Sequence, residues 1–65
     1  MLRVHEALEK LAAEDPVKAE LVKLRFFVGL RIPEAAEILG LSATTAKRYW
    51  TYARAWLYQE LTKAL

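Results

Sequence analysis

The residues that interrupt helices are few in this chain and stand well apart, and no other feature constrains the fold as strongly. The sequence contains only two glycines and two prolines in 65 residues. The intervals between them are rich in Ala, Leu, Glu, Lys and Arg, which favour helix. The interruptions lie at Asp15-Pro16, Gly29, Pro33 and Gly40-Leu41-Ser42. They predict an all-α fold, a compact domain of four helices at about residues 4–14, 16–28, 33–39 and 43–63.

Residues with suitable capping properties stand at the predicted helix ends. Asp15 is a favourable N-cap for the second helix, and Pro16 suits its first helical position. Pro33 begins the third helix in the same way, Gly40 closes it in a left-handed conformation, and Ser42 caps the fourth. Apolar residues repeat at helical spacing and predict the core faces: Val4, Leu8 and Leu11; Val17, Leu21, Leu24 and Val28; Ala46, Trp50, Ala53 and Leu57.

Length and composition exclude several classes of protein. A chain of 65 residues buries only about 60% of the surface that its unfolded form exposes, so a second domain or a large enclosed catalytic pocket does not fit. Without Cys there is no disulfide, no thiolate zinc site and no Cys nucleophile, and the single His5 has no nucleophile beside it. We therefore expect no enzyme activity, no catalytic or metal site, no cofactor and no small-molecule ligand.

No stretch of the sequence has the character of a membrane segment. A transmembrane helix needs about 18–20 consecutive apolar residues, and no apolar run approaches this length. The amino terminus opens onto an amphipathic pattern and lacks the apolar core of a signal peptide. Together with the lack of Cys, these features predict a cytoplasmic protein that does not bind membranes.

Positive charge is concentrated in the last third of the chain. The formal net charge is +2. Residues 1–29 sum to zero, residues 30–41 to −1 and residues 42–65 to +3. The last segment owes its charge to four cations against one acid: Lys47, Arg48, Arg54 and Lys63 against Glu60. A basic segment on an otherwise balanced domain favours a nucleic-acid partner, and an ordinary solvated helix face explains the same charge equally well.

The segment from Ile32 to Arg48 has the spacing of a helix-turn-helix. The small side chain of Ala36 lets the two helices approach, and Gly40 adopts backbone angles that a residue with a Cβ resists. Three apolar residues are placed to fill the wedge between the helices: Ile38, Leu41 and Ala46. In this motif the amino-terminal half of the second helix enters the major groove of DNA. The alternative is a plain helical corner whose polar face is solvated.

The polar face of the fourth helix supplies candidate DNA contacts. With Ala46 at the centre of the buried face and about 100° per residue, five side chains of this helix point away from the core: Thr44, Lys47, Arg48, Thr51 and Tyr52. Arg and Lys can donate to guanine edges or phosphates, Thr can bond to a base or pack its methyl group on thymine, and the Ser42-capped helix end favours a phosphate. The predicted DNA-binding residues are Ser42, Thr44, Thr45, Lys47, Arg48, Thr51 and Tyr52.

Several short runs of sequence together resemble a known family. They are ALEKL at 7–11, the Asp15-Pro16 pair, LRFFVGL at 24–30, EAAEILGLS at 34–42, TAKR at 45–48 and ARAWL at 53–57. In this order they resemble region 4 of bacterial RNA polymerase sigma factors of the sigma-70 type, especially the extracytoplasmic-function (ECF) group, and they span nearly the whole chain. The resemblance implies recognition of the upstream, minus thirty-five, element of double-stranded promoter DNA and docking on the β flap of the RNA polymerase core. It also implies that Lys47, Arg48, Thr51 and Tyr52 contact bases and phosphates.

The chain departs from the family pattern at a few positions. Arg31 stands where Ser or Thr commonly caps the third helix, so we expect that helix to begin without a polar cap. Ala35 and Ala46 replace larger aliphatic residues, which shifts packing onto Trp50. The family's promoter-melting region 2 lies upstream of region 4, and nothing precedes Met1. We therefore expect all 65 residues to form a single domain excised from a longer protein.

Two other functions are compatible with the sequence. Val22 and Phe26 lie four residues apart on the second helix, away from its main apolar stripe. They either complete a central helix that is buried on both sides or form an exposed patch for docking a protein. With such a patch, the chain is a protein-interaction module for the β flap or for an anti-sigma factor. The other alternative is the effector domain of a response regulator, which shares the helix-turn-helix.

Overall fold

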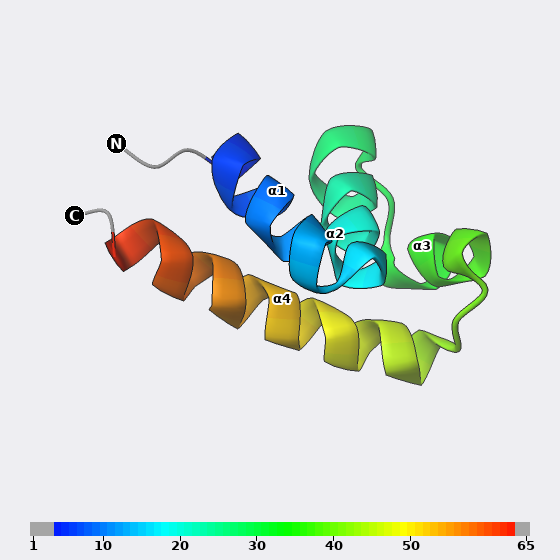
Figure 1. Cartoon of the computed structure of the whole chain (residues 1–65). Coiled ribbons are helices and arrows are strands. Elements are labelled where there is room, and N and C mark those ends of the chain that lie inside the picture. The colour runs from blue at the N-terminus through cyan, green and yellow to red at the C-terminus, as the bar shows by residue number, and fades with distance from the viewer. Residues whose placement is uncertain (1–3, 64–65) are drawn as a thin grey trace.

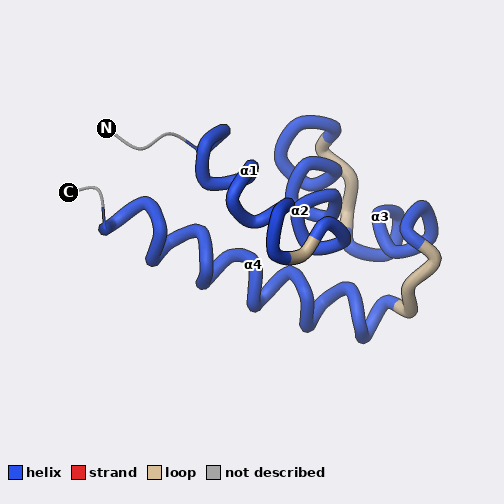
Figure 2. Tube along the Cα trace, viewed as in Figure 1, coloured by secondary structure: helices blue, strands red, loops and turns tan. Residues whose placement is uncertain are grey.

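The polypeptide forms four α-helices joined by short turns, as seen in a computed structural model that describes residues 4–63 (Figure 1). The helices are α1 (Val4–Glu14), α2 (Pro16–Lys23), α3 (Ile32–Leu39) and α4 (Ala43–Lys63), and a π-helical turn at Leu24–Val28 extends α2. Figure 2 shows helix throughout this range apart from the short connecting loops. The predicted all-α, four-helix fold is confirmed, with the predicted helix at 16–28 divided into α2 and the π turn.

The predicted caps hold the helix ends. At the start of α2 the backbone N–H of Lys18 donates to Oδ1 of Asp15 at 3.3 Å. At the start of α4 the backbone N–H of Thr45 donates to Oγ of Ser42 at 3.1 Å. Gly40 closes α3 with a φ of 70°, in the left-handed region that is costly for residues with a Cβ. Local chemistry therefore sets where these helices begin and end.

The third helix begins without a polar N-cap side chain, as expected. The helix α3 begins at Ile32, one residue before Pro33, and Arg31 is its N-cap. The backbone N–H of Arg31 donates to Oε1 of Glu34 at 2.8 Å. The Glu34 carboxylate thus satisfies the N–H of the N-cap residue, which is half of a capping box, while Arg31 offers no side-chain acceptor to the N–H groups of the first turn.

The core lies where α1, α2 and α4 meet. In Figure 1, α4 runs past α1 and α2 along its length, and α3 sits at its amino-terminal end. The main cluster is built from buried residues of all three helices: Ala7, Leu8, Leu11, Ala19, Val22, Ala53 and Leu57. Trp50 and Trp56 pack against it from α4 and are partly buried, as expected for amphipathic aromatic residues. One long helix therefore connects the core to the helix-turn-helix.

The wedge between α3 and α4 is filled by alanines, and the prediction that Ile38 lies there is wrong. Ala35, Ala36 and Ala46 are 0%, 2% and 0% exposed, whereas Ile38 is 63% exposed. With about 100° per residue, Ile38 lies about 110° around the helix from the midpoint of Ala35 and Ala36. Because alanines let the two backbones approach closely, α3 keeps a narrow buried face.

The predicted apolar stripe of α2 is also only partly correct. Leu21 is fully buried, but Val17 at one end and Val28 at the other are 41% and 63% exposed. Ala19 and Val22 are buried in the main cluster with residues of α1 and α4, so α2 is covered on more than one side. The prediction of a single apolar face therefore wrongly places Val17 and Val28 in the core.

Within residues 4–63, none of the helices combines the length and apolar character that crossing a bilayer requires.

Candidate nucleic-acid interface

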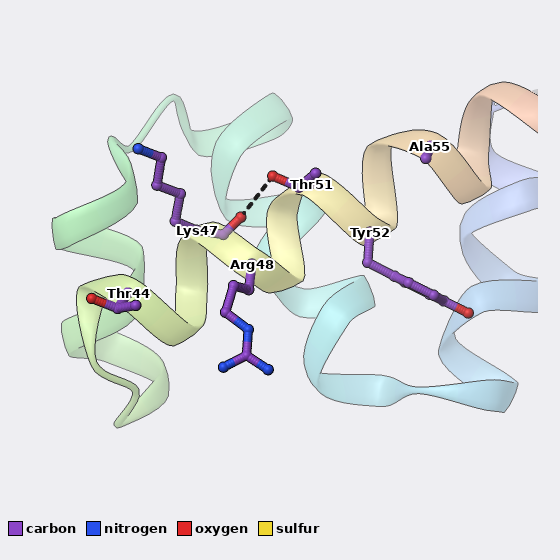
Figure 3. A pocket seen from close by; sticks show the side chains of 6 residues that line it. All are labelled: Thr44, Lys47, Arg48, Thr51, Tyr52 and Ala55. Atoms are coloured by element: carbon purple, nitrogen blue, oxygen red, sulfur yellow. Dashed lines mark hydrogen bonds between the residues drawn. The ribbon is translucent and has the colours of Figure 1, made fainter.

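A shallow groove lies on the exposed face of the amino-terminal half of α4 (Figure 3). The opposite face of α4 is anchored by Ala46 and Ala53, both fully buried. The groove is therefore presented by a helix held on the core, which keeps its side chains in register along the helix axis. Five of the seven predicted DNA-binding residues line it, together with one unpredicted alanine: Thr44, Lys47, Arg48, Thr51, Tyr52 and Ala55.

The two cations of this groove are available to a ligand. Lys47 and Arg48 are exposed, and neither takes part in an ion pair within residues 4–63. The one carboxylate of α4 is Glu60, which is occupied near the other end of the helix by Lys10 and Lys63. Figure 3 shows the Lys47 and Arg48 side chains leaving α4 in different directions. The pair thus presents two separate positive charges to an anionic surface.

The hydroxyl of Thr51 is already engaged. Its Oγ1 donates to the backbone carbonyl of Lys47 at 3.0 Å, drawn as a dashed line in Figure 3. The hydroxyl hydrogen is therefore unavailable to a base, and the methyl group and the oxygen lone pairs remain for contact. Thymine, which presents a methyl group in the major groove, suits such a side chain.

Ser42 and Thr45 are brought together at the helix end and do not line the groove. The Oγ of Ser42 accepts from the backbone N–H of Thr45 at 3.1 Å and donates to the Oγ1 of Thr45 at 2.9 Å. Both hydroxyls thus serve the N-terminal cap of α4. Their predicted contact with DNA would be made from this helix end and not from the face of the groove.

A model of the ECF sigma factor family matches residues 1–63. The chain belongs to the ECF sigma factor family. No curated protein and no solved structure matches it. Sigma factors are non-catalytic regulators that act in transcription initiation, and membership of this family implies RNA polymerase and promoter DNA as partners.

One cation of this sigma factor was left out of the predicted site. A second hollow, between the start of α3 and α4, shares Lys47 and Thr51 with the groove and is also lined by Arg54. Arg54 is exposed and, like Lys47, has no ion-pair partner in the described part of the chain. The i, i+4, i+7 spacing of Lys47, Thr51 and Arg54 could have identified Arg54 from the sequence. The basic face of α4 therefore extends beyond the predicted residues to Arg54.

A cation of α2 contacts the tyrosines of α4. The ammonium of Lys18 lies 4.4 Å from the ring centre of Tyr49 and 4.8 Å from that of Tyr52. It also pairs with Oδ2 of Asp15 at 2.5 Å. The hydrogen bond from Lys18 lowers the pKa of the Asp15 carboxyl below its ordinary value. Tyr52, at the edge of the groove, is thus in contact with a charge from outside the helix-turn-helix.

The predicted docking pair is divided by the fold. Val22 is fully buried, so it offers no surface to a partner, and its assignment as a docking residue is corrected to a core residue. Phe26 is 61% exposed, with its ring centre 5.8 Å from that of Trp50. The N–H of Gly29 donates to the carbonyl of Leu24, closing the wide π turn that carries Phe26.

Phe26 borders a groove that is almost wholly apolar. Residues from α1, the π turn and α4 line it: Val4, Phe26, Phe27, Arg54, Leu57, Tyr58 and Leu61. Phe27 and Tyr58 are 68% and 71% exposed. Adjacent exposed aromatic residues of this kind are characteristic of a protein-binding surface. Phe26 was predictable from the sequence but its neighbours in the groove were not, because they come from three separate segments.

Proposed function

We propose that this chain is region 4 of an ECF sigma factor and that α4 recognises the upstream, minus thirty-five, promoter element in the major groove of DNA. The observation that carries the proposal is the pair Lys47 and Arg48, exposed on a core-anchored helix and outside every ion pair of residues 4–63. A cation without an internal ion-pair partner can bind a phosphate or a guanine edge without first breaking a contact within the protein. The helix-turn-helix formed by α3 and α4 supplies the geometry in which such a face enters the groove.

The side chains of the groove divide into two roles. Arg48 presents a planar guanidinium that suits bidentate donation to guanine, and Thr51 presents its methyl group to thymine. Lys47 and Arg54, one on each side of Thr51 along α4, fit the flanking phosphates. Phosphate contacts fix the orientation of the domain on the duplex, and base contacts select the sequence. Recognition by this face should therefore depend strongly on salt.

A second candidate function uses the apolar groove around Phe26 and Phe27. Its side chains come from three segments that the fold brings together, and Phe26, Phe27 and Tyr58 stay exposed although the chain has a core to bury them in. This supports docking on the β flap of RNA polymerase or on an anti-sigma factor. Apart from Arg54, a proposed phosphate contact that also lines the apolar groove, the two functions use different residues and are compatible.

The test is an NMR titration of the chain, resolved by residue, at two salt concentrations. The ligand is a short duplex that the chain enriches from a randomised DNA pool. We expect amide shifts at residues 42–55 that fade at high salt, with a log-log slope of affinity near −0.9 for each neutralised phosphate. If these amides stay silent while amides of the π turn respond to a polymerase flap fragment, the chain is a docking module. Silence of both sets contradicts both functions.

A further inference from the structure

Lys18 lies outside the helix-turn-helix but contacts its recognition helix. The ammonium is 4.4 Å from the ring centre of Tyr49 and 4.8 Å from that of Tyr52, so it contacts both rings at once. These tyrosines lie three residues apart on α4, on neighbouring positions of one helix face. In Figure 3 the Tyr52 side chain points toward the ribbon of the preceding helices, away from Arg48. A cation on α2 thus connects the first half of the chain to the edge of the DNA groove.

The position of Lys18 is itself determined by Asp15. One carboxylate has two tasks: its Oδ1 accepts the backbone N–H of Lys18 at 3.3 Å, and its Oδ2 pairs with the Lys18 ammonium at 2.5 Å. The Lys18 side chain is only 16% exposed. The residue that starts α2 therefore also directs the ammonium toward the tyrosines of α4.

The Tyr52 ring needs such a contact to have one orientation. Tyr52 is 55% exposed and borders the groove beside Arg48. An aromatic side chain on an exposed helix face has more than one rotamer available. A cation over the face of the ring favours the rotamer that keeps the contact. Since Tyr52 forms one edge of the groove, its rotamer decides how much room the groove leaves for a base or a sugar.

We propose that Lys18 is a positioning residue for DNA recognition, holding Tyr52 in the orientation that shapes the groove of α4. The proposal rests on the proposed function of that groove. Lys18 acts through Tyr52 and not on DNA, because its ammonium is already paired with Asp15 and enclosed by two rings. To reach a phosphate it would have to leave both partners.

The test compares variants of the full chain binding the enriched duplex. Lys18→Met keeps most of the stem and removes the charge, and Lys18→Arg keeps a cation that stacks on aromatic rings. We expect Lys18→Met to lower affinity about three- to tenfold without changing the salt slope, and Lys18→Arg to retain most of the affinity. In a Tyr52→Leu background, Lys18→Met should have no further effect. Full additivity of the two losses would overturn the proposal.

Asp15→Asn provides a second way to release Lys18. Asparagine remains a good N-cap, so α2 keeps its start while the ion pair is lost. The variant should lower affinity in the same direction as Lys18→Met while the helical circular dichroism signal stays unchanged. If both variants bind as the parent does, Lys18 has no positioning role. If Lys18→Met lowers the salt slope by about 0.9, Lys18 contacts a phosphate directly and the proposal is wrong.

A measurement without DNA separates failure of this contact from failure of the proposed function. Protons next to the Lys18 ammonium should show an upfield ring-current shift that diminishes in Tyr52→Leu. Its absence shows that Lys18 does not hold Tyr52, whatever α4 binds. If the shift is present but the parent chain enriches no duplex and α4 amides respond to none, the DNA function fails, and the positioning role fails with it.

Discussion

The two halves of α4 differ in what their exposed side chains contact. In the amino-terminal half, Lys47 and Arg48 extend into solvent without an ion-pair partner in residues 4–63. In the carboxy-terminal half, Glu60 pairs with Lys10 of α1 at 2.7 Å and with Lys63 at 3.5 Å. The first half leaves its charge unsatisfied, whereas the second, beyond Arg54, pairs its charges within the protein and exposes apolar surface.

This difference separates the forces available to each half. Unpaired cations attract a polyanion over several ångströms, and the attraction weakens as salt screens it. An apolar groove binds by removing surface from water, which salt affects far less. A single helix of 21 residues thus carries two surfaces that respond to different conditions. Membership of the ECF sigma factor family implies both promoter DNA and RNA polymerase as partners, and we propose that each half of α4 serves one of them.

The largest expected effect tests the anchoring of α4. Leu57 is 5% exposed in the main core cluster, and Leu57→Ala should lower the free energy of unfolding by about 2–5 kcal/mol. This loss approaches the whole stability of a small domain, so the variant should be largely unfolded at moderate temperature. Arg48→Ala, in the other half, should stay within about 0.5 kcal/mol of the parent. Denaturation followed by circular dichroism measures both, and equal losses would contradict the comparison.

Next in size is the effect of Arg48→Ala on DNA binding. We expect affinity for the enriched duplex to fall by about 1–3 kcal/mol and base preference to relax at one position, because a side chain that selects a base is lost. Fluorescence anisotropy with matched and single-substitution duplexes measures this. Lys63→Ala removes a cation from the other half and should leave affinity nearly unchanged. An Arg48→Ala variant that binds like the parent removes Arg48 from the site.

Phe27→Ser should sharpen the comparison from the apolar side. Phe27 is 68% exposed, so the fold should tolerate a polar residue there. If the apolar groove docks on the polymerase, binding to a β-flap fragment should weaken by at least about 1 kcal/mol, as expected for loss of an aromatic contact residue. Affinity for DNA and its salt slope should not change. Calorimetry with the flap fragment measures the first effect. If Phe27→Ser instead weakens binding to DNA and leaves binding to the flap fragment unchanged, the assignment of the two halves is reversed.

The smallest expected effect concerns the ion pairs of Glu60. The hydrogen bond from Lys10 lowers the pKa of the Glu60 carboxyl in the folded state, so the pair stabilises the fold above the unfolded-state pKa. That contribution is lost as pH falls through the lowered, folded-state pKa. As the pH is lowered from about 7 to about 3, the melting temperature of Glu60→Gln should therefore fall less than that of the parent. Lys10→Met should behave similarly, and parallel pH curves for all three proteins would show that the pair contributes nothing.

The helix boundaries and much of the candidate site were predictable from local sequence. Asp15 and Ser42 act as the caps that their side chains predict, and Thr44, Lys47, Arg48, Thr51 and Tyr52 share one groove as their spacing predicts. These features depend on groups a few residues apart along one helix, where backbone geometry alone fixes their relation. The start of α3 was predicted one residue late, at Pro33, because Arg31 offers no capping side chain that would mark the helix end in the sequence.

Contacts between helices were decided only by the tertiary structure. The sequence by itself determined four helices, their order, and a cationic face on the last of them, since periodicity and capping are local properties. It could not determine that Val22 is buried while Ile38 is exposed, or that the ammonium of Lys18 reaches Tyr52. Burial and cross-helix contacts depend on which neighbour covers each face. That choice follows from packing the whole bundle at once, because each helix fills the space that the others leave.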